Sequence, residues 1–158
     1  MDLLNMSNDE IMIMFYKLPE KWVVEVEEEY NGFTYMVCFN AKEGFRCGYV
    51  KIPEGHPFYE NRDYRDFNVG YEVNWGLSFS GRLKDHDGWW IGFDCNHSNN
   101  GVDTSEMKKY WTKEEYDLIS FYVNCCNDKY GITPNTRDVS RTCMSIIDEL
   151  LEPDRKLL

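Results

Sequence analysis

The stretch that decides the fold is residues 22–39, which read WVVEVEEEYNGFTYMVCF. The side expected to be buried holds Trp22, Val24, Val26 and Tyr30, and these residues alternate with Val23, Glu25, Glu27 and Glu29. This two-residue period is typical of a half-buried β-strand. Asn31-Gly32 then supplies the strongest short signal for a two-residue hairpin turn. Alternation resumes over residues 33–39. The stretch therefore predicts two antiparallel strands joined by a tight turn.

Further strands are predicted beyond this hairpin. Residues 45–49 continue the alternation and extend the hairpin to a three-stranded antiparallel meander. A loop rich in Pro, Gly and charge covers residues 53–68. Alternation returns over residues 69–79, in a strand expected to be broken or bulged at Gly70 or Gly76. After a polar turn it returns again over residues 89–95, so we expect a sheet of about five strands. The polar stretch 96–106 is expected to be an ordered loop or a flap.

Helices flank the strands along the chain. Ser7 and Glu10 form a capping box at the start of a predicted N-terminal helix, and Thr112 and Glu115 form another at the start of a C-terminal helix. A further helix carries apolar residues on one face over residues 139–151. Strands followed by helices predict an α+β fold: an antiparallel sheet of about five strands with an N-terminal helix and two C-terminal helices packed on it.

Charge limits the class of function. The 158 residues include 17 Lys and Arg against 28 Asp and Glu, which gives a net charge of −11. This length suits a single domain, residues 1–158. A negative field repels phosphates, so we expect neither direct nucleic-acid binding nor membrane binding. The expected partner is a basic surface on another protein.

The sequence also carries an expectation about cellular location. No stretch has the length and apolarity of a membrane span, and the first residues lack the features of a signal peptide. We therefore expect a cytoplasmic protein, in a host bacterial cell. The six cysteines form no CxxC pair, so reduced thiols packed as small apolar side chains are expected.

An acidic row is the first candidate binding feature. Glu25, Glu27 and Glu29 are expected on one solvent-facing side of the first strand, about 6.6–7 Å apart. This spacing is close to the phosphate repeat of a nucleic-acid strand, so the row can imitate a nucleic-acid backbone. Glu114 and Glu115 add negative charge at the start of a helix. The alternative is an ordinary solvated face that protects a sheet edge from aggregation.

An excess of aromatic residues is the second feature. Phe, Trp and Tyr make up 16% of the chain, too many to be buried completely in so small a domain. Exposed Tyr and Trp side chains on an acidic surface suit a protein interface, and Tyr59 and Trp90 are the candidates for it. The alternative is a large aromatic core.

The densest group of reactive side chains surrounds the last predicted strand. Asp94 and His97 lie at its end, and His56 and Asp103 lie in loops that can face it. Asp94, His97 and Asp103 can form a metal site, or Asp94 and His97 can act as an acid/base pair with His56 nearby. The alternative is that Asp94 and His97 satisfy backbone amides, because the histidines lack an HxH or HxxxH spacing.

Three blocks carry a resemblance: GYVKIPEGHPFY (residues 48–59), WGLSFSG (75–81) and WWIGFDCNH (89–97). They resemble a family of small uncharacterised proteins of phages, prophages and actinobacteria, whose pattern is approximately GYVxVPxGHP, HGGLT[FY] and WWxGFDxAHxGD. The resemblance covers about residues 48–100. It implies a phage or mobile-element origin and no known reaction.

The departures from this pattern bear on catalysis. Asn74 stands where the family pattern has His, Trp75 replaces its first Gly, and Asn99-Asn100 stands where the pattern has Gly-Asp. Amides neither titrate near neutral pH nor bind zinc well. These positions therefore argue against catalysis by this chain.

The leading hypothesis is a phage-encoded, anti-CRISPR-like protein. It would inhibit a host CRISPR effector nuclease by direct binding, with an acidic, aromatic-rich surface that blocks the nucleic-acid or PAM-binding channel. The alternatives are a hydrolase that uses Asp94 and His97, and a cyclic-nucleotide sponge, for which the sequence offers no phosphate-cradling Gly loop or Arg cluster. No cofactor is expected, and a homodimer is left open.

Overall fold

The computed structural model describes residues 2–70, 76–97, 100–125 and 131–152. Within these ranges the chain forms a five-stranded antiparallel sheet and four α-helices, so the predicted α+β class is confirmed. The elements are β1 (Trp22–Tyr30), β2 (Phe33–Asn40), β3 (Phe45–Ile52), β4 (Phe79–Leu83), β5 (His86–Asp94), α1 (Asn8–Lys17), α2 (Thr104–Met107), α3 (Lys113–Cys125) and α4 (Thr136–Leu150), with short 3-10 helices at Leu3–Asn5, Tyr64–Asp66 and Lys108–Tyr110.

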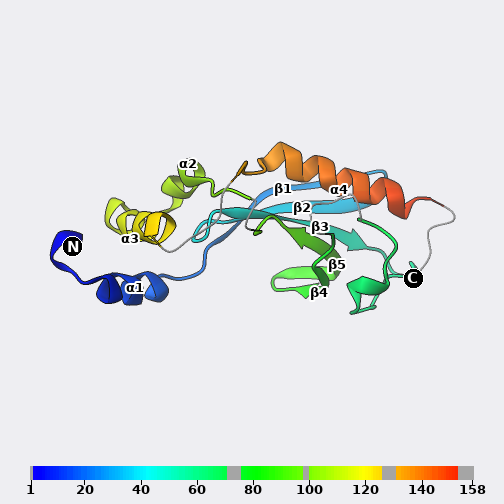
Figure 1. Cartoon of the computed structure of the whole chain (residues 1–158). Helices are drawn as coiled ribbons and strands as arrows, with labels where there is room; N and C mark the ends of the chain where they lie inside the picture. Colours follow the sequence, from blue (N-terminus) through cyan, green and yellow to red (C-terminus); the bar gives the residue numbers. More distant parts are fainter. Residues whose placement is uncertain (1, 71–75, 98–99, 126–130, 153–158) are drawn as a thin grey trace. The chain divides into compact units, whose positions relative to one another are not determined.

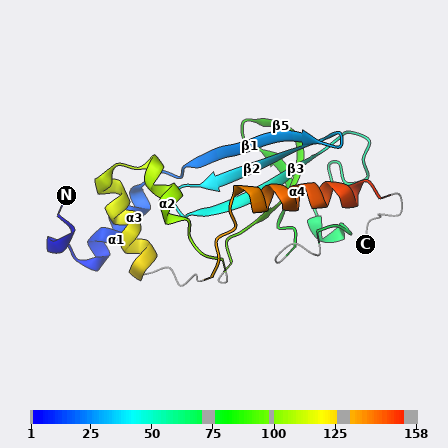
Figure 2. The same ribbon diagram turned by 90° about the horizontal axis from the view of Figure 1, so that it is seen from above.

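The strands are ordered β1-β2-β3-β5-β4, so β1 and β4 form the edges of the sheet. Asn31 and Gly32 both have positive φ angles, 48° and 85°, as a two-residue type I′ turn requires, and they join β1 to β2 as predicted. Antiparallel pairing of β3 with β5 places Cys47 opposite Asp94 and Ile52 opposite Trp89. Figure 2 shows β1, β2 and β3 side by side in this order.

Contacts divide the chain into two compact units. The first comprises residues 1–23, 39–45 and 96–133, and the second comprises residues 24–38, 46–95 and 134–158. The expected single domain stays a prediction.

The second unit is built around α4, which runs along one face of the sheet (Figure 1). We call this side the α4 face. Asn135 and Asp138 form a reciprocal capping box at the start of α4, and the apolar side of the helix packs on the sheet. The buried residues of this core are Phe33, Tyr35, Val37, Val50, Ile52, Phe58, Phe67, Val69, Trp89, Ile91, Phe93, Cys95, Val139, Cys143, Ile146, Ile147 and Leu150.

The other side of the sheet also buries apolar side chains. Met36, Cys38 and Trp90 are buried together there, and Tyr49, Phe79 and Leu83 pack against them. The central strands are therefore covered on both faces, and an alternating apolar pattern does not separate their buried side from an exposed one.

The first unit has its own core, formed by Phe15, Phe39, Ala41, Met107, Trp111 and Ile119. Helix α1 contacts α3, where the Phe15 and Tyr122 rings stack with centroids 4.2 Å apart. Trp111 donates its indole N–H to the Ala41 carbonyl at 2.8 Å. Lys21 Nζ lies 4.2 Å from the centroid of the Trp111 ring. Ser7 caps α1 by accepting from the Glu10 N–H, as the capping box predicted.

Two predicted elements differ from the structure. The strand expected over residues 69–79 begins only at Phe79, because Gly70 and Gly76 adopt positive φ angles of 77° and 75° that interrupt extended backbone. Residues 71–75 of that prediction lie outside the described ranges. The expected loop at 96–106 contains the short helix α2, whose first turn is capped by the Asp103 carboxylate.

None of the helices in the described ranges combines the length and the apolarity needed to cross a bilayer. Four of the six cysteines, Cys38, Cys47, Cys95 and Cys143, are buried free thiols.

Candidate functional site

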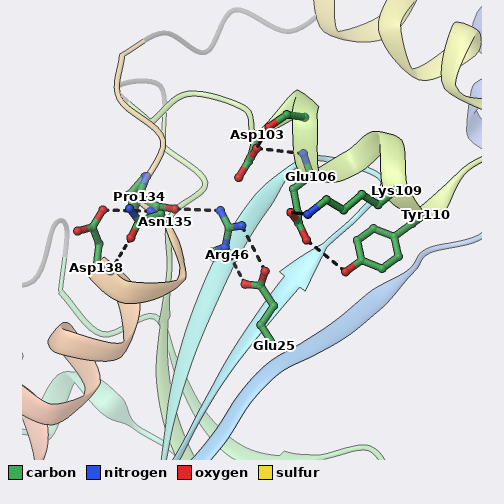
Figure 3. Close-up of polar contacts among 10 residues, drawn as sticks. Glu25, Arg46, Asp103, Glu106, Lys109, Tyr110, Pro134, Asn135 and Asp138 are labelled. Atoms are coloured by element: carbon green, nitrogen blue, oxygen red, sulfur yellow. Dashed lines mark hydrogen bonds and ion pairs between the residues drawn. The ribbon is translucent and has the colours of Figure 1, made fainter.

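Glu25 is not part of an exposed acidic row. Its carboxylate accepts two bonds from Arg46, Nε to Oε1 at 2.7 Å and Nη2 to Oε2 at 3.2 Å (Figure 3). The side chains are only 3% (Arg46) and 11% (Glu25) exposed, and Arg46 Nη1 also donates to the Pro134 carbonyl at 3.2 Å, just before α4. The prediction that Glu25 faces solvent beside Glu27 and Glu29 is therefore wrong.

The physical reason lies in the burial pattern of β1. Glu25 and Val26 are neighbours in sequence, yet both are half-buried. Val26 packs against the α4-face core, while Glu25 reaches Arg46. The two-residue alternation shifts between these residues, so a period counted across the whole strand assigns Glu25 to the wrong side.

The exposed members of the row are Glu27 and Glu29, and Glu28 between them is also exposed. Glu28 accepts a hydrogen bond from the Tyr35 hydroxyl at 3.1 Å. The carboxylates of Glu27 and Glu29 make no hydrogen bond or ion pair with any described residue. The pKa of the Cys38 thiol is raised to about 11, mainly by burial and in smaller part by the charges of Glu25 and Glu27. The negative field of β1 therefore extends to the neighbouring strand.

The two glutamates at the start of α3 have different surroundings. Glu114 is exposed. Glu115 is half-buried: it accepts the Thr112 N–H at 2.9 Å, and its own N–H donates to the Thr112 hydroxyl at 3.2 Å. Hydrogen bonds that the carboxyl accepts from Thr112, the backbone N–H first, lower the pKa of the Glu115 carboxyl. Glu115 thus completes the predicted capping box of the helix.

The predicted interface aromatics lie mostly inside the protein. Trp90 is 2% exposed and donates its indole N–H to the Asp87 carbonyl at 3.0 Å, so its assignment to the surface is wrong. Tyr59 is half-buried and packs against the α4-face core. Alternation predicted Trp22 and Val24 as buried, but they are 50% and 44% exposed. Both belong to β1, although contacts assign Trp22 to the first unit and Val24 to the second.

Asp94 and His97 belong to different compact units, the second and the first respectively. Asp94 ends β5 and accepts from the Ser78 hydroxyl at 3.4 Å. The His97 N–H donates to the Asn100 side chain at 3.2 Å, and the Asn100 N–H donates to the His97 carbonyl at 2.8 Å. Asn100 is only 4% exposed, so this amide closes a loop.

The other predicted ligands are also engaged locally. His56 Nδ1 accepts from the Phe58 N–H at 3.1 Å, and burial lowers the pKa of the His56 ring. Asp103 accepts from Glu106 N–H and Ser105 Oγ at the start of α2 (Figure 3). Across the described ranges, no group of three or more His, Cys, Asp or Glu side chains is placed to hold a metal ion. Asn74 lies outside those ranges.

Sequence reasoning missed Arg46. A cation within the alternating strand Phe45–Ile52 is unusual, and this was the available signal that a buried carboxylate lies nearby.

Comparison of the chain with protein-family models, curated proteins and solved structures finds no match.

Proposed function

We propose that this chain is a binding protein that inhibits a host defence nuclease, a CRISPR effector, by occupying its basic nucleic-acid or PAM-binding channel. The protein would be phage-encoded and act in the cytoplasm of the infected bacterium. The net charge and the phage-like sequence blocks support this choice of partner.

The observation that carries the proposal is the pair Glu27 and Glu29 on β1. Both carboxylates are exposed on an edge strand, and no described residue neutralises either of them. The Glu27 and Glu29 carboxylates, which have no partner among the described residues, present a negative surface to a cationic groove at little desolvation cost, because they are already in water.

The exposed side chain of Val24 extends this surface within the second unit. An apolar contact beside charged ones is the usual composition of an interface, in which the apolar part contributes affinity and the charges contribute orientation and association rate. We call Val24, Glu27 and Glu29 the β1 surface.

The test starts from the intact chain in bacterial cells. Tagged protein is purified from cells that express a CRISPR effector, copurifying proteins are identified by mass spectrometry, and cleavage by the purified effector is then measured with increasing inhibitor. We expect stoichiometric inhibition. We also expect affinity to fall as salt rises, because ions screen charges over about 8–10 Å.

The charge-reversed variant Glu27→Lys with Glu29→Lys should lose inhibition by at least tenfold while staying folded. The matched control is Glu54→Lys with Asp9→Lys, which changes the net charge equally at exposed positions outside β1. Equal loss in both variants would show that only bulk charge matters. An effector whose cleavage is unaffected at stoichiometric protein would contradict the proposal itself.

A further inference from the structure

Trp89 carries an unexplained polar atom in the second unit. The residue lies on β5, is 2% exposed and packs in the α4-face core. Its indole Nε1 is buried, and no described residue accepts a hydrogen bond from it. A buried donor without an acceptor is uncommon in native proteins and calls for a specific explanation, such as a bound ion.

Two arginines converge on the same ring. The guanidinium carbons of Arg62 and Arg82 lie 5.4 Å and 5.7 Å from the centroid of the Trp89 ring. Since both distances are measured to the same ring centroid, the two guanidinium carbons are at most about 11 Å apart. Arg62 comes from the loop before the 3-10 helix Tyr64–Asp66, and Arg82 comes from β4. Residues distant in sequence thus assemble a cationic cluster that the sequence did not predict.

The carboxylates around this cluster do not balance it. Arg82 Nη2 lies 3.7 Å from Glu60 Oε1, and Arg82 Nη1 donates to the Gly88 carbonyl at 3.2 Å. Arg62 makes no ion pair or hydrogen bond with the described part of the chain. Arg65, three residues later, is different, because it is bonded to Asp63 through Nε at 2.8 Å.

We propose that Arg62, Arg82 and Trp89 form a binding site for an oxyanion, a phosphate or carboxylate group. Guanidinium groups donate bidentate hydrogen bonds to such oxygens, and the indole N–H supplies a further donor. Contact with the aromatic ring restrains each guanidinium group beside the indole. The Glu60 carboxylate acts as the internal counter-ion that the ligand replaces.

Both guanidinium groups can be reached by an anion from solvent. Arg82 is 54% exposed and Arg62 is exposed. This site is separate from the β1 surface, and it does not depend on the proposed inhibitor function.

The test uses inorganic phosphate and the full-length protein labelled with ¹⁵N. The assigned indole N–H resonance of Trp89 is followed as phosphate is added, with sodium chloride at matched ionic strength as reference and acetate as the carboxylate probe. We expect a saturable shift of the Trp89 resonance with phosphate, with acetate or with both, and none with chloride. The anion that saturates at the lower concentration identifies the source of the oxyanion.

Three variants make the test specific. Arg62→Gln should weaken binding about tenfold, the scale of one lost charge-assisted contact. Glu60→Gln should strengthen binding, because it removes the competing carboxylate. Arg65→Gln is the matched control and should leave the affinity unchanged. A shift no larger than that with chloride, or equal weakening by Arg62→Gln and Arg65→Gln, would mean an adventitious ion only and would overturn the proposal.

Discussion

Replacement of Glu25 by alanine should destabilise the protein far more than replacement of its neighbour Glu27. Glu25→Ala leaves the Arg46 guanidinium, 3% exposed, without its carboxylate partner. Removal of one partner from a buried ion pair costs about 3–5 kcal/mol, because the remaining charge stays buried and uncompensated. Glu27 is exposed without a described partner, so Glu27→Ala should change the free energy of unfolding by no more than about 0.5 kcal/mol.

The assay is urea unfolding at neutral pH, followed by tryptophan fluorescence, for the wild type and both single variants. The double variant Glu25→Leu with Arg46→Met distinguishes the ion pair from simple loss of packing. It should recover most of the stability lost in Glu25→Ala, since apolar side chains of similar volume replace buried pairs at little cost. Equal small effects of Glu25→Ala and Glu27→Ala on the free energy of unfolding would refute the reasoning. They would support the prediction that Glu25 faces solvent.

Two further predictions concern the sheet. Gly48→Ala should lower the free energy of unfolding by about 1–3 kcal/mol in the same assay, because the new Cβ would clash with the Phe93 ring and lie 2.7 Å from Cys143 Sγ; a stability equal to wild type would contradict this packing. Iodoacetamide should alkylate Cys38 at pH 8 about a hundredfold more slowly in the folded than in the denatured protein, since burial raises the pKa of the thiol from 9.0 to about 11. Equal alkylation rates of the folded and denatured protein, measured by mass spectrometry, would contradict the raised pKa. The raised pKa contributes stability that is fully present below about pH 9 and is lost as the pH rises toward 11.

Local features of the fold were predictable from the sequence. The hairpin of β1 and β2 follows from alternation and from Asn31-Gly32, whose backbone requirements concern two residues only. Helices α1 and α3 were located by capping boxes, which also join residues three apart. The residues that form the turn and the caps are at most three apart in the sequence, so these local structures form without help from distant residues.

The candidate site was less predictable because its side chains depend on distant partners. Glu25 is directed inward by Arg46, which lies 21 residues later. Trp89 and Trp90 are both buried because β5 is covered on both faces, whereas alternation assigns one of two neighbours to solvent. Only Glu27 and Glu29 kept the exposure expected of the acidic row.

The position of α4 in the chain has a consequence for synthesis on the ribosome. The α4 face of the sheet is complete once β5 has emerged, but the helix that covers it follows several tens of residues later. At roughly 5–20 residues per second, this interval lasts on the order of several seconds. During that time Val37, Val50 and Ile91 lack their helical cover, and the nascent chain exposes an apolar strand surface that chaperones bind.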